Sequence, residues 1–168
     1  MTIVTQTVGK ELADLYSGFT LQDVGIGTTG TYSTPQYNKK KTDKLLIGGL
    51  SEILYQGFEH DVRPLALTMT HESAYNTVLA YNLHYLPLNV RQEIIKVVLQ
   101  SNIARIQSNQ PLIIDYYDLK RRVPESQYIV RRYKITGTRV LAAIPLSDWD
   151  KAIRRKSGWE NHWRVLKG

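Results

Sequence analysis

The stretch from residue 64 to residue 107 most limits the folds open to this chain, because two hydrophobic periodicities follow one another within it. Residues 64–70 and 77–85 carry the strand-like apolar pattern of two segments joined by a short turn, which predicts a hairpin. Residues 90–107 place apolar side chains at helical spacing over a wide stripe, which predicts a largely buried helix. A hairpin packed against one main helix is therefore expected.

Local signals set the expected ends of the main helix and the elements around it. Asn89 is its predicted N-cap, with Gln92 as the partner in a capping box, and Pro111 prevents its continuation. The further expected elements are a helix over 10–16, helices over 112–122 and 127–133, a strand over 138–144, and a last helix with Ser147 as N-cap and Asp150 as the acid of its capping box.

Residues 25–44 run through Gly, Thr, Ser, Pro, Tyr and Lys with no apolar period, which is long for a loop inside a compact domain. They are either a solvated loop or an arm that orders on a neighbour. We expect an α+β fold: a small, strongly bent antiparallel sheet, open or barrel-like, packed with one main helix. The expected divisions are an extended N-terminal arm over 1–45, a single domain over 46–156 and a C-terminal tail over 157–168.

Composition excludes several classes of protein. The chain has no cysteine, which excludes a disulfide framework, thiolate zinc sites and a cysteine nucleophile. No segment approaches the roughly 20 apolar residues that a membrane helix needs. The N-terminus has neither the basic start nor the apolar region of a signal peptide. We therefore expect a soluble protein, intracellular or assembled inside a cell, with no membrane contact.

The net charge of +7 is unevenly distributed along the chain. Residues 1–88 carry a net charge of −2, and residues 89–168 carry +9. A basic half of this kind suits an anionic partner, either nucleic acid or an acidic protein neighbour. Nine residues form the candidate binding set for that partner: Lys120, Arg121, Arg122, Arg131, Arg132, Lys134, Arg154, Arg155 and Lys156.

Aromatic residues are interleaved with these basic clusters. Cations neutralise phosphates while aromatic rings stack on bases, so the mixture would suit DNA. A basic rim facing acidic neighbours, with aromatics in core or interface, is favoured over DNA, because no zinc-finger, KH-loop or RNP1 pattern is present. Four aromatic residues in the arm and the tail are candidate interface anchors: Tyr32, Tyr37, Trp159 and Trp163.

Three patterns were weighed as chemical sites. Residues 25–30 match GxGxxG, but no helix start follows, so a Gly/Thr loop is favoured over a nucleotide site. His71 and His84 could meet a carboxylate across the hairpin and hold a metal. Asp115 and Asp118 would share a helical face and could hold Mg²⁺ for nuclease chemistry, yet three basic residues follow closely and favour an ordinary ion-paired surface. We expect no enzymatic activity, no cofactor and no bound metal.

Several segments resemble small virion proteins of T-even-like tailed phages. The resemblance is carried by residues 59–67, by Tyr-Asn-Leu-His-Tyr-Leu-Pro over 81–87 with Arg91 after it, by Arg-Arg-Tyr-Lys over 131–134, and by Ile-Pro-Leu-Ser-Asp-Trp over 144–149. In that family the Asn-Leu-His-Tyr-Leu-Pro segment opens a helix, and some members carry the label DNA end protector. The resemblance covers about residues 59–153.

The resemblance implies a structural component of a tailed-phage virion, in the head–tail connector or neck, the tail or the baseplate. Such a protein is assembled in the host cytoplasm, contacts other virion proteins and copies of itself, and uses no cofactor. The alternative is a DNA-binding protein that protects or contacts genome ends through the basic C-terminal half. A metal-dependent nuclease using Asp115, Asp118 or a histidine is the third hypothesis.

Overall fold

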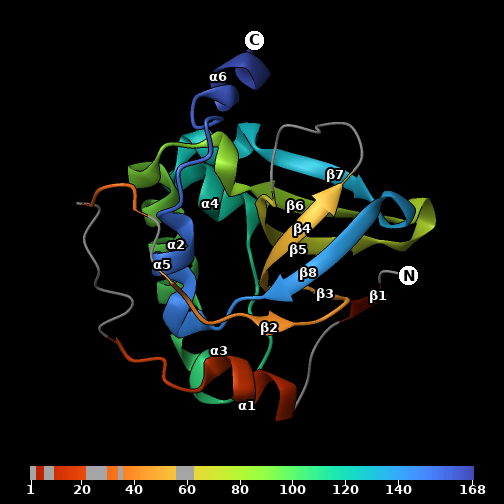
Figure 1. Ribbon diagram of the computed structural model, residues 1–168, viewed down its shortest axis with the longest axis vertical. Helices are drawn as coiled ribbons and strands as arrows, with labels where there is room; N and C mark the ends of the chain where they lie inside the picture. Colours follow the sequence, from red (N-terminus) through yellow and green to blue (C-terminus); the bar gives the residue numbers. More distant parts are fainter. Residues whose placement is uncertain (1–2, 6–9, 22–29, 34–35, 56–62) are drawn as a thin grey trace.

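The computed structural model describes residues 3–5, 10–21, 30–33, 36–55 and 63–168. They form an α+β fold, as predicted, with helices packed against a bent, six-stranded antiparallel sheet (Figure 1). The strand order is β2-β8-β4-β5-β6-β7, and a separate parallel pair joins β1 to β3. The strands are β1 (Ile3–Thr5), β2 (Lys40–Lys41), β3 (Lys44–Leu46), β4 (Leu50–Tyr55), β5 (Leu65–Glu72), β6 (Thr77–Asn82), β7 (Val130–Lys134) and β8 (Thr138–Ala143).

The sheet is open, so the barrel-like alternative is wrong: β2 and β7 end the strand order and do not pair with each other. The predicted hairpin is confirmed as β5 and β6, and the predicted strand over 138–144 is confirmed as β8. The register shifts between Glu52 and Ile53 and again between Thr68 and Thr70. Irregularities of this kind bend strands and increase local twist, which explains the strong curvature.

Six helices lie in the described part of the chain, and α2, as predicted, is the main one. They are α1 (Lys10–Tyr16), α2 (Leu88–Ser101), α3 (Ile103–Gln107), α4 (Tyr116–Arg122), α5 (Trp149–Ile153) and α6 (His162–Lys167). Short 3₁₀ turns join strand to strand at η2 (Ser73–Tyr75) and η5 (Ile135–Gly137). Others join a helix and a strand: η3 (Leu83–Tyr85), η4 (Pro124–Tyr128) and η6 (Leu146–Asp148).

The predicted start of the main helix is wrong by two residues. Helix α2 begins at Leu88 with Pro87 as its N-cap, so Asn89 and Gln92 lie inside the helix and form no capping box. The backbone N–H of Leu88 instead donates to the hydroxyl of Tyr32, at 2.9 Å. A side chain 56 residues away thus satisfies one of the free amides of the first turn, which local sequence signals do not reveal.

The predicted helix over 90–107 is two helices, because Asn102 interrupts it. The Asn102 side-chain amide donates to the carbonyl of Val98 at 2.7 Å and to that of Ile113 at 2.9 Å. Its oxygen accepts from the N–H of Ile113, also at 2.9 Å. This buried amide ties the end of α2 to the segment before α4, and the short helix α3 follows.

Two other predicted helices need correction. Residues 127–133 do not form a helix, because η4 leads into strand β7, where Tyr133 is buried and accepts from the Asn82 side chain at 3.0 Å. Ser147 is not an N-cap, since it lies within η6, and Asp148 occupies the N-cap position of α5. Helix α4 does fall inside the predicted 112–122 range and begins after Asp115.

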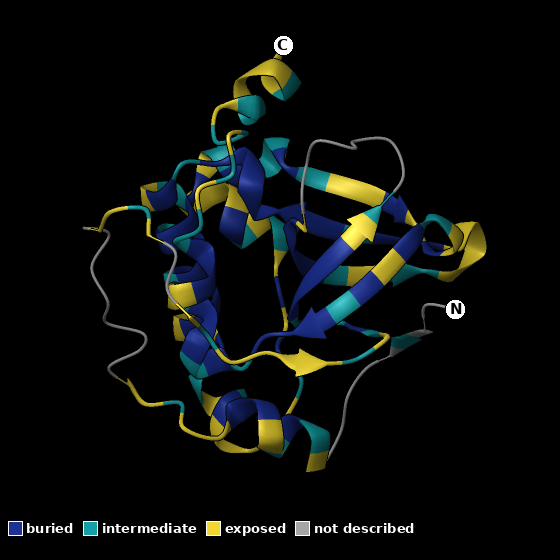
Figure 2. Cartoon of the chain, in the orientation of Figure 1, coloured by how far each residue is buried: buried dark blue, intermediate teal, exposed yellow. Residues whose placement is uncertain are grey.

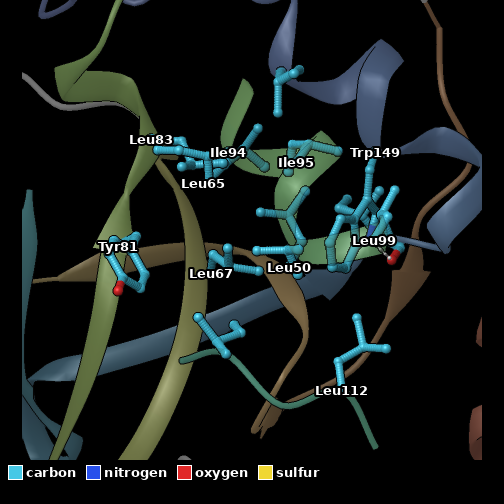
Figure 3. Packing of buried hydrophobic residues seen from close by; sticks show 14 of the residues in the cluster. Leu50, Leu65, Leu67, Tyr81, Leu83, Ile94, Ile95, Leu99, Leu112 and Trp149 are labelled. Atoms are coloured by element: carbon cyan, nitrogen blue, oxygen red, sulfur yellow. Dashed lines mark hydrogen bonds between the residues drawn. The ribbon is translucent and has the colours of Figure 1, made fainter. Parts of the chain in front are cut away.

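Buried side chains form two clusters. Figure 2 shows where the buried residues lie along the helices and strands. The larger cluster joins Leu65 and Leu67 of the sheet to Ile94 and Leu99 of α2 and to Trp149 of α5, as Figure 3 shows. The smaller cluster consists almost entirely of residues on the strands, together with Ile135 of η5. Its members are Leu45, Ile53, Ala66, Val78, Ala80, Tyr133, Ile135 and Val140. The sheet is therefore buried on both sides along part of its length.

Part of the predicted arm packs on the domain. Helix α1 matches the predicted helix over 10–16 and buries Leu12, Leu15 and Tyr16 in the larger cluster. The Tyr16 hydroxyl donates to the carbonyl of Gln110 at 2.7 Å. Residues 30–33 and 36–41, here named the strap, run across α5 to the edge strand β2 (Figure 1).

Candidate functional site

The strap is fastened to the domain by side chains and backbone groups spread along its length. The Tyr32 hydroxyl accepts from α2, and the guanidinium of Arg91 lies 5.6 Å from the Tyr32 ring centroid. The N–H of Asn38 donates to a carboxylate oxygen of Asp148 at 2.7 Å. At the far end, Lys40 and Lys41 pair with β8. The predicted anchor Tyr32 is thus engaged within its own chain.

The strap also covers a buried carboxylate. Glu52 on β4 is 1% exposed, and its carboxylate accepts from the hydroxyl of Tyr37 and from the ammonium of Lys39, which lies 3.3 Å from both oxygens. A buried carboxylate is costly unless hydrogen-bonded and paired with a cation, and here the strap supplies both partners. Tyr37, the second predicted anchor of the arm, therefore holds the strap on its own domain.

A second polar group lies near this carboxylate. The guanidinium of Arg155 contacts Nε2 of buried His84 at 3.1 Å and donates to the carbonyl of Arg63. A guanidinium has donors and no acceptor, so Nε2 of His84 is the acceptor in this contact. Positive charge from Arg155 and Arg63 also reaches Tyr37 and lowers its pKa, against larger opposing effects.

Alkaline pH tests how tightly the buried tyrosines are held. Burial, reinforced by the hydrogen bond and charge of Glu52, raises the pKa of Tyr37 to about 12; burial raises that of Tyr16 to about 12 and also raises that of Tyr81. The folded protein therefore keeps protons that the unfolded chain releases near pH 10, and it loses stability as the pH rises from 10 toward 12. We expect the free energy of unfolding to fall there.

The measurement is chemical denaturation at successive pH values, with tyrosinate absorbance recorded in parallel. Tyr37→Phe should flatten the decline, and Tyr117→Phe, at a 78% exposed position, is the matched control and should leave it unchanged. A late-titrating tyrosine that persists undiminished in Tyr37→Phe would contradict the role given to Tyr37.

Arg91 organises the junction between α2 and the chain after α5. It is fully buried, and it donates to the carbonyls of Leu86, Ile153 and Arg155, each at 2.8 Å. It also donates to the hydroxyl of Ser157 at 3.1 Å. One guanidinium thus supplies four hydrogen bonds and fixes the position of residues 153–157, which carry part of the predicted basic set.

The predicted basic residues lie on three separate elements. Lys120, Arg121 and Arg122 end α4, where Asp118 accepts from Arg121 at 2.6 Å and lies 3.8 Å from Arg122. Arg131, Arg132 and Lys134 lie on β7, and Arg154, Arg155 and Lys156 follow α5. Carboxylates also pair with Arg132 and Arg154, through Glu72 at 2.6 Å and Asp150 at 2.9 Å. The exposed members with no carboxylate pair among the described residues are Lys120, Arg131, Lys134 and Lys156.

The two predicted tail anchors also dock on their own chain. Trp163 of α6 stacks on Tyr128 with ring centroids 6.3 Å apart, and the ammonium of Lys167 lies about equally far from both rings. Trp159 contacts His162, which in turn contacts buried Tyr85. Both tryptophans are half-buried against the larger cluster. Helix α6 lies at one end of the molecule (Figure 1), with Val165 exposed.

The described residues contain no group of three metal-ligating side chains. Asp115 is the N-cap of α4 and accepts from the N–H groups of Tyr117 and Asp118. Asp118 pairs with arginines, as the ion-paired interpretation predicted. A pocket of about 670 Å³ lies beside β8, and Lys41, Asp43 and Arg139 are among the residues that line it. Residues 25–29 of the glycine motif lie outside the described residues.

Sequence patterns missed the buried polar residues. Arg91 lies one helical turn before Ile94 and Ile95, on the face that α2 buries, and that position was the available signal. No such signal existed for Glu52, since a single acid in a strand is ordinary. Its burial depends on the distant strap.

No protein-family model, no curated protein and no solved structure matches this chain. Across the described residues, none of the helices has the length and apolar character needed to span a bilayer.

Proposed function

We propose that this chain is a structural component of a tailed-phage virion that acts through protein–protein contacts. The observation that carries the proposal is the segment Asn-Leu-His-Tyr-Leu-Pro over 82–87, which leads from a strand into the main helix, as the resemblance implies. The proposal covers a position in the neck, the tail or the baseplate of the particle.

The segment owes its shape to its own side chains and to its burial. The Asn82 side chain accepts from the N–H of His84 at 3.1 Å, which closes the turn η3, and Pro87 follows as the N-cap of α2. Residues 82–86 are each at most 1% exposed. The resemblance therefore rests on residues that shape the core, and it supports a common fold more directly than a common ligand.

The surface supports a role in binding. Catalysis needs a nucleophile or an acid–base pair in a cleft, whereas the acids weighed as catalytic, Asp115 and Asp118, are occupied in capping and ion pairing. Within the predicted basic set, the residues that are exposed and have no described carboxylate partner lie on α4, on β7 and after α5. Exposed cations beside aromatic residues suit the rim of an interface with acidic neighbours.

Sedimentation of particles tests the proposal. In lysates of cells that produce this protein, we expect the chain to sediment with assembled particles and to appear in their mass spectrum. After the particles are opened and treated with DNase, it should stay bound because protein contacts hold it. A chain found only in slow-sedimenting soluble fractions contradicts the virion role.

DNA binding is the second candidate, and one observation favours it. Tyr117 is 78% exposed on α4, one turn before Lys120 and Arg121, so a ring and two cations share one exposed region. If DNA is the partner, log K should fall steeply with log salt, and DNase should release the chain from opened particles. Replacing Arg121, Arg122, Arg131 and Arg132 with Glu should then abolish binding. Little DNA affinity at about 0.15 M salt favours the structural role.

A further inference from the structure

Strand β7 forms one edge of the six-stranded sheet. It pairs with β6 through five residue pairs in unbroken register, and the strand order ends there. Within the described ranges, no strand pairs with its other side. Such an edge presents N–H and C=O groups that are a template for another extended chain. The carbonyl of Lys134 also accepts from the Thr138 hydroxyl at 2.8 Å, which leaves one of its two lone pairs for a partner.

Two hydrogen bonds beyond the ends of β7 determine which of its backbone groups face β6. The N–H of Asn82 donates to the carbonyl of Ile129 at 3.0 Å, and the N–H of Ile135 donates to the carbonyl of Asn76 at 3.1 Å. In an antiparallel ladder, successive residues alternately face the partner strand and face away. Three residues of β7 therefore direct their N–H groups to the open edge: Val130, Arg132 and Lys134.

Three of the five side chains of β7 are basic and exposed: Arg131, Arg132 and Lys134. Arg132 and Lys134 are two residues apart and lie on one face of the strand, while Arg131 lies on the other. Arg132 is held by Glu72, whose two oxygens accept from its guanidinium at 2.6 and 2.9 Å. Of the described carboxylates, none pairs with Arg131 or Lys134, so the edge carries a net positive charge.

Charge decides which kind of chain can occupy this edge. A second copy that paired β7 with β7 would set cations opposite cations, and like charges directly across a ladder destabilise it. An acidic strand would instead place opposite charges across the ladder, and such pairs stabilise it. Nucleic acid would satisfy the cations, but it offers no alternating N–H and C=O groups to the three open amides.

We propose that β7 binds an extended acidic polypeptide segment as an added strand, with acidic residues at every second position facing Arg132 and Lys134. The inference rests on the proposed assembly role, and it specifies the surface and the chemistry of one partner. We take the added strand to be antiparallel to β7. In that arrangement, the partner residues directly opposite Arg132 and Lys134 are also those whose N–H groups point toward β7. The acidic residues therefore supply both the charge and the hydrogen bonds.

The first test uses the isotopically labelled full chain and a capped ten-residue peptide that alternates Glu with Val and Thr. We expect hydrogen exchange to slow at the amides of Val130, Arg132 and Lys134. The amides of Arg131 and Tyr133, which already bond β6, should change little. Binding without this alternation, or no binding at millimolar peptide, overturns the proposal.

The second test separates hydrogen bonds from charge on the peptide. N-methylation of the glutamates removes the N–H groups that point toward β7, and it should weaken binding at least about tenfold. N-methylation of the same number of Val and Thr residues leaves net charge and length equal and blocks only outward amides, so it should change affinity less than about threefold. Equal loss from both peptides overturns strand addition.

The third test acts on the protein. Lys134 has φ −71°, which proline adopts without strain, so Lys134→Pro removes one open N–H together with the charge. Lys134→Ala removes the charge alone. We expect Lys134→Pro to weaken peptide binding several-fold more than Lys134→Ala does, while Lys120→Ala on α4 has no effect. Equal affinities for the Pro and Ala variants, when circular dichroism shows that both are folded, overturn the proposal. If the Pro variant does not fold, the comparison of the two N-methylated peptides tests strand addition instead.

Two further outcomes separate this inference from the proposed function. A 12-nucleotide single-stranded DNA that protects the same three amides, when the peptide does not, overturns the acidic-strand proposal. If the Lys134→Pro variant enters particles as efficiently as the unmodified chain does, this edge is not used in assembly. That result would not contradict the virion role. Absence of the unmodified chain from particles contradicts the virion role, while the peptide measurements still decide the edge.

Discussion

Replacing Arg91 with alanine is expected to destabilise the fold by about 4 kcal/mol. The substitution removes four hydrogen bonds from a charged donor and leaves the buried carbonyls of Leu86 and Ile153 without it. A buried acceptor that loses its partner costs about 1–3 kcal/mol. For a chain of this size, the midpoint of thermal unfolding should fall by roughly 12 °C, measured by circular dichroism.

Arg154→Ala is the matched control for Arg91→Ala. Arg154 is the same residue type in the same region, but its partner Asp150 and its own side chain are partly exposed, at 21% and 23%. A partly exposed ion pair contributes about 0–1 kcal/mol, so the control should cost less than about 1 kcal/mol. Equal losses in the two variants would show that Arg91 does not organise the junction.

Replacing Trp149 with alanine is expected to lower the free energy of unfolding by about 4 kcal/mol. Trp149 is 1% exposed, contributes to the larger cluster, and donates from its indole N–H to the carbonyl of Ile144 at 2.9 Å. Truncating a fully buried aromatic leaves a cavity in addition to losing the transfer free energy of the ring. Equilibrium denaturation with urea measures the loss.

Trp149→Phe separates packing from the hydrogen bond. The phenyl ring retains most of the buried volume but leaves the carbonyl of Ile144 without its indole donor, so a smaller loss of about 1–2 kcal/mol is expected. Trp163→Ala is the control for tryptophan removal, because that residue is half-buried on α6 and should cost less than Trp149→Ala. A larger loss at Trp163 would contradict the ranking.

Local patterns predicted the elements whose signals lie within one segment. The α+β class, the helix over 10–16, the hairpin β5–β6 and the strand β8 all follow from periodicity and turn residues, and all are confirmed. Wherever a distant partner decides the structure, the prediction is wrong or shifted. Residues 130–133 become part of strand β7 because β6 pairs with them, although the local pattern over 127–133 favoured a helix.

The candidate site was less predictable for the same reason. The basic residues and the ion pairing of Asp118 were predicted from the sequence, but the partner of Arg132 was not, because Glu72 lies on a different strand, 60 residues away. Tyr32 and Tyr37 were chosen as anchors for a neighbour, and the structure shows them fastened to α2 and to Glu52 of their own chain.

The order of strands in the sheet has a consequence for the newly made chain. Strand β4 lies between β5 and β8, and β8 emerges from the ribosome more than eighty residues after β4. Until then, one long side of β4 has no partner, and Arg91 still lacks the carbonyls after residue 152 that it will bind. Long-range pairing of this kind slows folding and leaves strand edges unpaired, which favours aggregation. Completion of the fold is therefore delayed until β8 and residues 153–155 have been synthesised, and a chain interrupted before them would be prone to aggregate.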